Sequence, residues 1–441
     1  MKVLLVKCHK RTIFSRVEPI VTEPLELEYL SAILNRMNIP HRIYDALLEG
    51  GTFHGIFQEY KPDVLVLSGY ITAVQVIKEY AEYSKGNQPN VKVVVGGVHA
   101  EVNMEDFFSE AVDVIIHSDG VNTFERVMRS EFAIECLEGI QGIAYQDHGS
   151  WRVNQRIYTD IEKLPIPDRS YFYQYKDRTK YLEYCPVAIV KTALSCPFQC
   201  SFCYCKLLNM GRYSERSVDS VIEELKGIEA DVVWIVDDSF LLDRKRIQSF
   251  IHQIEENQIH KKFIAYSRVD FIAKNGDIIK KLKDIGFVEL IVGMEAVDDH
   301  ALEEYNKHCS AFENRRTVEI MERYGLRLTA LFIAGIDFTK KDFFHLRRWI
   351  RKMKLESYTL SVFTPIKGIA EFEKYRGQIQ TWDYEKWDFL HLVMKPTRMK
   401  PLSFYFQFYL VYAQQLVTSS LARRVVWQSI KKLIGGEGNR E

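Results

Sequence analysis

The sequence predicts an α/β protein in which a Rossmann-like, doubly wound parallel sheet precedes a (β/α)₆ partial TIM barrel and a helical C-terminal extension. Short apolar runs alternate with segments of helical periodicity, first before residue 150 and again between residues 186 and 370. Strands that are apolar along their whole length are typical of parallel sheets covered by helices on both faces. We therefore expect two α/β domains, a linker at residues 151–185 and an extension at residues 371–441.

The first domain, residues 1–150, is predicted to be a flavodoxin-like or Rossmann-like sheet. A hairpin is expected around Asp147-His148-Gly149, where the alternation of strands and helices is interrupted. The predicted strands are Val3–Val6, His41–Tyr44, Asp63–Ser68, Val91–Val95 and Val112–Ile116, and the clearest helices are Glu23–Met37 and Asn122–Ser130.

The second domain, residues 186–370, contains six predicted strands, and each adjacent pair encloses a helical pattern. Six such units suit a partial barrel, since a full eight-stranded barrel usually needs about 250 residues. The predicted strands are Val187–Leu194, Val232–Val236, Phe263–Tyr266, Val288–Val292, Leu328–Ala334 and Tyr358–Phe363.

The extension is rich in aromatic residues and contains a predicted helix over Phe404–Leu433 with basic residues near its end. One interpretation is a helix that lies on a membrane surface. Gln407, Gln414 and Gln415 interrupt its apolar face, and the sequence therefore favours a cap helix packed over the barrel.

Composition excludes several classes of protein. Of the 441 residues, 47% are hydrophobic and 27% are charged, as in ordinary globular proteins. Lys plus Arg equals Asp plus Glu at 59 each, so no net field favours nucleic acid. The apolar start is short and is followed at once by Lys7, unlike a signal peptide, and no run of 18 apolar residues occurs. We expect a cytoplasmic protein.

The eight cysteines are too unevenly spaced for a disulfide framework. Cys196, Cys200 and Cys203 have the spacing C-x₃-C-x₂-C directly after a predicted strand. Three thiolates on one loop bind three irons of a 4Fe–4S cubane and leave the fourth iron open, whereas zinc needs a fourth ligand that Cys205 is badly spaced to provide. The sequence therefore predicts a catalytic iron–sulfur cluster.

With the aromatic Phe202 before the third cysteine, residues 185–370 resemble the radical S-adenosylmethionine (SAM) superfamily. The resemblance implies that the open iron binds the amino and carboxylate groups of SAM. It also implies that an electron from a donor such as flavodoxin or ferredoxin cleaves SAM to methionine and a 5′-deoxyadenosyl radical.

The resemblance assigns SAM contacts by position, all of them near C-terminal strand ends, with Phe202 beside the cluster. Asp237 and Asp238 stand where many members carry a Gly-Gly-Glu type motif that binds the SAM amino group. Arg268 fits the position that pairs with the SAM carboxylate, and Glu295 fits one that touches ribose or methionine. A solvated turn and ordinary ion pairs are the alternatives for these residues.

The first domain resembles the cobalamin-binding domain of one large radical SAM subgroup, which includes methylases and oxidative cyclases, and the linker around Leu164–Arg169 resembles that subgroup's inter-domain segment. Glycine pairs at strand ends would admit a corrin at the switch point of the sheet. The residues assigned to cobalamin on this basis are Ser68, Gly69, Gly96, Gly97, His99 and Gly120.

Many cobalamin domains carry Asp-x-His-x-x-Gly, whose histidine ligates cobalt. The comparable stretch here, Asp45–Gly50, has Leu47 at the histidine position. We therefore expect cobalamin to bind base-off and without a histidine ligand; His9 and His99 are loop alternatives, although lone histidines are more often structural.

These features predict a cobalamin-dependent radical SAM enzyme that methylates an unactivated carbon or phosphorus centre of a small molecule or natural product. The same architecture also serves cyclisation or rearrangement without methyl transfer, which is the first alternative. A non-catalytic cluster or corrin sensor is the second. The sequence identifies neither the substrate nor a catalytic acid or base.

Overall fold

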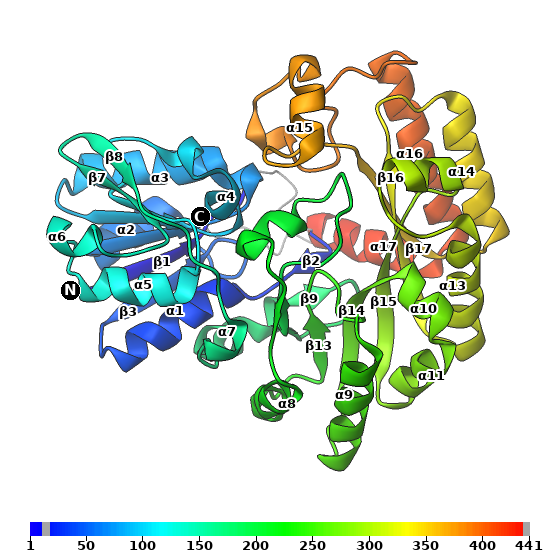
Figure 1. Cartoon of the computed structure of the whole chain (residues 1–441), viewed down its shortest axis with the longest axis horizontal. Helices are drawn as coiled ribbons and strands as arrows, with labels where there is room; N and C mark the ends of the chain where they lie inside the picture. The colour runs from blue at the N-terminus through cyan, green and yellow to red at the C-terminus, as the bar shows by residue number, and fades with distance from the viewer. Residues whose placement is uncertain (11–17, 435–441) are drawn as a thin grey trace.

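A computed structural model describes residues 1–10 and 18–434. It confirms the predicted fold class: an N-terminal sheet domain, drawn in blue and cyan, lies beside a barrel-like domain in green and yellow, with helices at the C-terminal end (Figure 1). The short strand β2 (Ile20–Val21) pairs with β9 (Lys180–Tyr181), which the sequence did not indicate. The last seven residues of the predicted extension lie outside the described residues.

The N-terminal sheet has the strand order β3-β1-β4-β5-β6-β7-β8, and its first five strands are parallel. The strand order reverses between β1 and β4, which makes the loops after these strands the topological switch point. The predicted hairpin adds two antiparallel strands and carries the sheet to Val153, past residue 150. The strands are β1 (Val3–Lys7), β3 (His41–Asp45), β4 (Val64–Ser68), β5 (Lys92–Gly96), β6 (Val114–Ile116), β7 (Ile143–Asp147) and β8 (Ser150–Val153), and the helices are α1 (Leu25–Arg36), α2 (Phe53–Tyr60), α3 (Val74–Asn87), α4 (Val98–Asn103), α5 (Gly120–Arg129) and α6 (Ile134–Leu137).

The second sheet has six parallel strands in the chain order β10-β13-β14-β15-β16-β17. The predicted strand Val187–Leu194 is two strands, because β11 (Ala193–Leu194) leaves the sheet and pairs antiparallel with β12 (Ser214–Glu215). The six strands are β10 (Val187–Val190), β13 (Val232–Ile235), β14 (Lys262–Arg268), β15 (Phe287–Glu295), β16 (Arg327–Ala334) and β17 (Ser357–Val362), and the helices are α8 (Val218–Gly227), α9 (Arg244–Glu256), α10 (Val269–Lys274), α11 (Gly276–Asp284), α12 (Asp299–Glu304), α13 (Ala311–Tyr324) and α14 (Lys340–Lys352).

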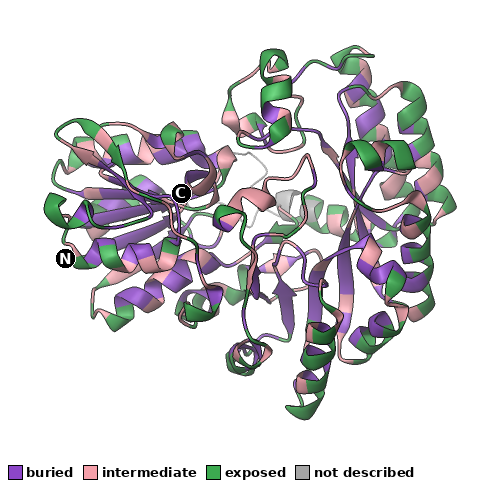
Figure 2. Ribbon diagram, in the orientation of Figure 1, coloured by how far each residue is buried: buried purple, intermediate pink, exposed green. Residues whose placement is uncertain are grey.

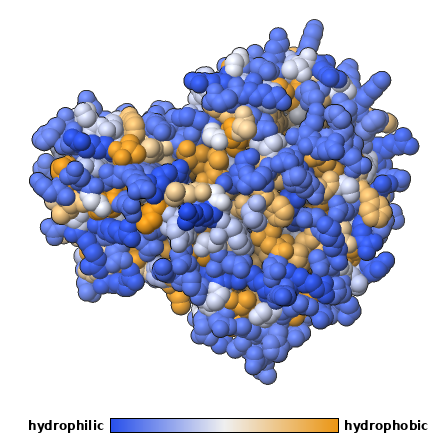
Figure 3. Space-filling model, viewed as in Figure 1, coloured by the Kyte–Doolittle hydropathy of each residue, from blue (hydrophilic) through white to orange (hydrophobic). Residues whose placement is uncertain are grey.

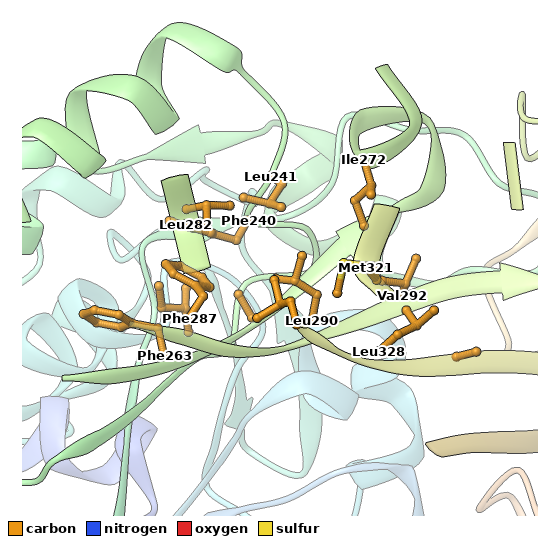
Figure 4. Close-up of a cluster of buried hydrophobic side chains, with 14 of the residues drawn as sticks. Phe240, Leu241, Phe263, Ile272, Leu282, Phe287, Leu290, Val292, Met321 and Leu328 are labelled. Carbon is orange, nitrogen blue, oxygen red and sulfur yellow. The ribbon is translucent and has the colours of Figure 1, made fainter. Parts of the chain in front are cut away.

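The central strands are buried on both faces, and the helices that cover them expose their outer sides (Figure 2). In the barrel core, Phe263 and Phe287 have ring centroids 5.2 Å apart. Leu282, from α11, lies in the same layer between strands and helices (Figure 4). Continuous apolar runs in the sequence thus became central strands because both faces of each sheet are covered.

Buried charges in the linker tie the two domains together. The Arg169 guanidinium donates to Glu23 (2.8 Å), which precedes α1, and to Glu224 (2.5 Å), which lies on α8 of the barrel. The neighbouring Asp168 carboxylate accepts hydrogen bonds from Ser31 (2.6 Å) and Asn35 (2.8 Å) of α1. The linker, which includes α7 (Ser170–Tyr175), is therefore held between both domains.

The extension differs from its prediction. The single predicted helix is two helices, α16 (Pro401–Thr418) and α17 (Ser420–Ile434), which follow α15 (Ala370–Tyr375). Ser419 separates them because its backbone is extended and its hydroxyl accepts from the Ala422 amide, which caps α17. None of the helices within residues 1–10 and 18–434 is long and apolar enough to cross a membrane.

Candidate functional site

A cavity of about 930 Å³ lies between the two sheets. Its wall is formed by the cysteine loop and the carboxyl ends of the barrel strands on one side, and by loops after β4, β5 and β6 on the other. On the face shown in Figure 3, apolar side chains gather towards the centre, where the domains meet, and the periphery is mostly hydrophilic. Clefts between domains are a common location for ligand sites.

The three predicted cluster ligands, Cys196, Cys200 and Cys203, all lie in this wall. Ser195 has a φ of 65° and so turns the chain immediately before the first of them. Within residues 1–10 and 18–434, no three Cys, His, Asp or Glu side chains converge on the position of one metal ion. A cubane does not require this, since each thiolate binds a different iron atom, and the donor set therefore fits a cluster.

Asp237 anchors the start of the cysteine loop. Its buried carboxylate accepts from the amides of Thr192 (2.6 Å) and Ala193 (2.9 Å), and from the Thr192 hydroxyl. Burial raises the pKa of Asp237, while Lys191 and these donors oppose the shift. Its two oxygens thus already have three donors from the chain.

Asp238, the adjacent predicted residue, is placed differently. Both residues line the cavity, but the Oδ2 atom of Asp238 is buried without a hydrogen-bond partner. The nearest cation is the ammonium of Lys191, 3.9 Å away, which donates instead to the Val236 carbonyl. A buried carboxylate oxygen without a donor is costly unless a ligand supplies one.

Arg268 lies beside the cysteine loop at the end of β14. Its guanidinium is 3.5 Å from the Cys200 sulfur and stacks on the Phe198 ring at 3.6 Å from the centroid. It also pairs with Asp270 at 2.9 Å. The structure therefore brings this predicted residue next to the predicted cluster.

Glu295 ends β15 in an unusual backbone conformation. Its φ is 60°, and the register of β15 with β16 shifts at this residue. Its carboxylate accepts from the Lys307 ammonium at 2.8 Å, and both groups are buried in the cavity wall. A Cβ atom on Gly293 would lie 2.3 Å from the Glu295 carboxylate and 2.8 Å from the Lys307 ammonium, so a side chain there would displace this ion pair. Sparse backbone conformations of this kind often occur at functional sites.

Phe202 also lines the cavity and packs edge-on against Tyr305, with ring centroids 5.3 Å apart. Lys307 was not predicted as a site residue, because it lies in a loop after α12 and no spacing rule connects it with Glu295. The same holds for Lys191, which is buried in the wall beside Asp238.

The residues predicted to contact cobalamin divide into two groups. Gly97 and Gly120 line the cavity, whereas Ser68, Gly69 and Gly96 do not belong to its lining. A Cβ atom on Gly97 would lie 2.8 Å from the Ser68 hydroxyl, and one on Gly69 would lie 2.8 Å from the Ala73 Cβ. The glycine pairs therefore allow the loops after β4 and β5 to pack against each other.

Two residues of the N-terminal wall were not predicted as contacts. Tyr70 follows β4 at the switch point, lines the cavity and has 51% of its surface exposed, with the Lys7 ammonium 5.2 Å from its ring. His117 follows β6, and neither of its buried ring nitrogens has a hydrogen-bond partner. Burial lowers the pKa of His117, which favours a neutral ring. An exposed aromatic ring beside a neutral imidazole in one wall fits a large ligand with an apolar face.

The other candidate histidines are held by carboxylates. His99 lies outside the lining of this cavity, and its Nε2 atom is 2.8 Å from Asp106. His9 Nε2 is 2.9 Å from Asp45, the first residue of the stretch compared with the cobalt-ligand motif. Neither His9 nor Leu47 lines the cavity.

Two sequence-family models match the chain. A B12 binding domain matches residues 17–128, and the Radical SAM superfamily matches residues 190–350. The chain is a radical SAM enzyme with a B12-binding domain. Family membership implies a 4Fe–4S cluster, SAM and cobalamin as its cofactors.

Curated relatives of this radical SAM enzyme are similar over most of their lengths. It is 26% identical over 409 residues to an uncharacterized methyltransferase of Pyrococcus horikoshii, covering 90% of this chain and 88% of the relative. It is 24% identical to the hopanoid C-3 methylase of Methylococcus capsulatus, over 94% and 80%. It is 25% identical to the anaerobic magnesium-protoporphyrin IX monomethyl ester cyclase of Cereibacter sphaeroides, over 77% and 57%.

Two solved structures share the fold. The cobalamin-dependent SAM radical enzyme OxsB aligns with a TM-score of 0.67 at 16% identity, over 98% of this chain and 61% of OxsB. The radical SAM methyltransferase TsrM of Kitasatospora setae aligns with a TM-score of 0.67 at 15% identity, over 92% and 83%. The relatives thus include both methyltransferases and a cyclase.

Proposed function

We propose that this enzyme is a cobalamin-dependent methylase that acts on an unactivated carbon or phosphorus centre of a small molecule. The observation that supports it is one cavity whose wall contains both the three cysteines and the loops after β4, β5 and β6 of the N-terminal sheet. Methylation of such a centre requires that one bound substrate is accessible both to the radical and to the methyl donor. Two of the three relatives described above are named as methylases or methyltransferases.

In this proposal Cys196, Cys200 and Cys203 hold the cluster. When bound, the cluster and SAM supply the substrate radical, and cobalamin supplies the methyl group. Arg268 faces the SAM carboxylate from beside Cys200, and Glu295 together with Lys307 holds the ribose or methionine part.

For the SAM amino group we propose Asp238, whose unpaired oxygen lines the cavity, together with Phe202 beside the cluster. Asp237 was predicted for the same role, but its oxygens already accept from Thr192 and Ala193. We therefore assign it a positioning role, in which it fixes the start of the cysteine loop.

We further propose that cobalamin binds base-off, without a histidine ligand, over Tyr70. Support comes from Leu47 at the histidine position and from the exposed Tyr70 ring at the switch point. Gly97 and Gly120 then approach the corrin, while Ser68, Gly69 and Gly96 shape the loops that hold it.

Electron paramagnetic resonance of the Co(II) form tests this coordination. We expect no splitting from an axial nitrogen in the wild type, and the same spectrum in His117→Phe and His9→Phe variants. A triplet splitting that disappears in either variant would refute binding without histidine, and Tyr70→Leu should shift the visible spectrum of bound cobalamin.

The reaction is tested with the anaerobically reconstituted holoenzyme, SAM, and reduced flavodoxin or ferredoxin as electron donor. Both 5′-deoxyadenosine and S-adenosylhomocysteine are expected. Deoxyadenosine alone would indicate a cyclase or mutase instead, in line with the cyclase relative. Absence of both products, with cluster and cobalamin verified, would favour a sensor.

A further inference from the structure

The two C-terminal helices carry a concentration of exposed apolar side chains. Of the twenty exposed large hydrophobic residues within the described part of the chain, eight lie on α16 and α17. Five of them are on α16, and two of these are almost fully open, Leu402 at 86% and Val417 at 78%. Isolated exposed hydrophobic residues are ordinary, but a group on consecutive helices marks a contact surface.

The exposed large hydrophobic residues of α16 share one face of the helix. At 100° per residue they fall within an arc of about 100°. This C-terminal stripe consists of Leu402, Phe406, Tyr409, Ala413, Leu416 and Val417. On α17, Val426, Trp427 and Ile430 are exposed at helical spacing as well.

The structure packs α16 against the barrel, as the sequence favoured, but the glutamines belong to the packed side of the helix. Gln407, Gln414 and Gln415 were expected to interrupt the apolar face, but they lie on the opposite, packed side. Gln414 donates to the Arg347 carbonyl (3.1 Å) and Gln415 to the Tyr358 carbonyl (3.0 Å), while Gln407 is buried. The glutamines therefore attach α16 to the barrel and leave its outward face continuous and apolar.

The charge near the stripe is predominantly basic. Residues 395–434 contain seven Lys and Arg and no Asp or Glu, in a chain whose formal net charge is zero. The helix that packs beside α16, α14, adds six basic residues and one acidic residue. The Arg424 and Lys431 side chains are exposed, and the Lys431 ammonium lies 5.7 Å from the Trp427 ring.

We propose that the outward faces of α16 and α17 bind the surface of an anionic lipid bilayer. Apolar and aromatic side chains flanked by Lys and Arg are typical of helices that lie at a membrane interface, where the basic groups meet lipid phosphates. The charge pattern selects this occupant over a neutral apolar partner, which would gain nothing from the flanking cations. Lipid binding of this kind does not depend on the reaction that the barrel catalyses.

Vesicle flotation of the purified full-length protein tests the proposal. We expect binding to vesicles of phosphatidylcholine with phosphatidylglycerol, weak binding to phosphatidylcholine alone, and loss of binding at high ionic strength. Phe406→Ser with Trp427→Ser should lower the partition coefficient about tenfold or more, and Arg424→Glu with Lys431→Glu should abolish the preference for anionic lipid.

Matched controls lie on α13. Phe312 is 62% exposed, much like Phe406 at 61%, and Arg315 is an exposed arginine on the same helix. Phe312→Ser and Arg315→Glu should leave vesicle binding unchanged, and all variants should keep the far-UV circular dichroism of the wild type. No binding to anionic vesicles, equal binding to both vesicle types, or equal losses in the controls would overturn the proposal. A dimer in light scattering that Phe406→Ser dissociates, without vesicle binding, would assign the surface to a second copy instead.

Discussion

Replacement of Gly97 by alanine tests whether the loops after β4 and β5 are shaped by their glycines. Gly97 has φ 97° and ψ −178°, a region that is essentially restricted to glycine and costs other residues about 1–3 kcal/mol. The new Cβ would also lie 2.8 Å from the Ser68 hydroxyl and 3.1 Å from the Gly69 backbone. Such overpacking costs about 1–3 kcal/mol more. We therefore expect Gly97→Ala to destabilise the N-terminal domain by ~2–6 kcal/mol.

Gly120 provides the matched control, because it also lines the cavity and a Cβ there has no neighbour within 4 Å. Gly120 begins α5, where alanine should be neutral or stabilise by about 0.5–1 kcal/mol. Urea unfolding measures stability, and hydrogen exchange in β4 and β5 locates the change. Equal stability of Gly97→Ala and wild type would refute the reasoning. If Gly120 faces bound cobalamin as proposed, Gly120→Ala should weaken cobalamin binding without loss of stability.

Three further predictions concern charged groups. Asp237→Asn should lower the unfolding free energy by about 1–3 kcal/mol and reduce the iron bound after reconstitution, because a buried donor loses its acceptor. Asp238→Asn should change the unfolding free energy by less than about 0.5 kcal/mol, because the Asp238 Oδ2 atom has no donor. Equal losses in the two variants would contradict this difference. Removing either Glu295 or Lys307 alone should cost about 3–5 kcal/mol, while removing both should cost clearly less than the sum; additive losses in this cycle would argue against a buried pair. Burial alone would raise the pKa of Asp168, but hydrogen bonds from Ser31, Ser170 and Asn35 hold it below its usual value. Its contribution should therefore be present above the unfolded-state pKa of about 3.9 and be lost as the pH falls below it. Asp168→Asn should accordingly be about 1–2 kcal/mol less stable than wild type near neutral pH and equally stable in strong acid, and a constant difference would rule out this linkage.

The sequence alone determined the fold class and predicted the cluster ligands, because both depend on local pattern. Apolar runs of strand length and helical spacing are visible residue by residue, and a C-x₃-C-x₂-C loop needs no partner from elsewhere in the chain. The sequence also predicted where the barrel strands end. Arg268, Glu295 and Asp238 follow from those predicted ends, and all three line the cavity.

The tertiary structure decided what depends on distant parts of the chain. Whether Asp237 or Asp238 is available to a ligand depends on Thr192 and Ala193, which are more than forty residues away. Lys307 and His117 line the cavity because of the conformation of their loops, which the spacing of residues in the sequence does not predict. The direction in which α16 turns its glutamines was likewise set by packing against α14 and β17, because a helical pattern fixes which residues share a face but not which face meets the core.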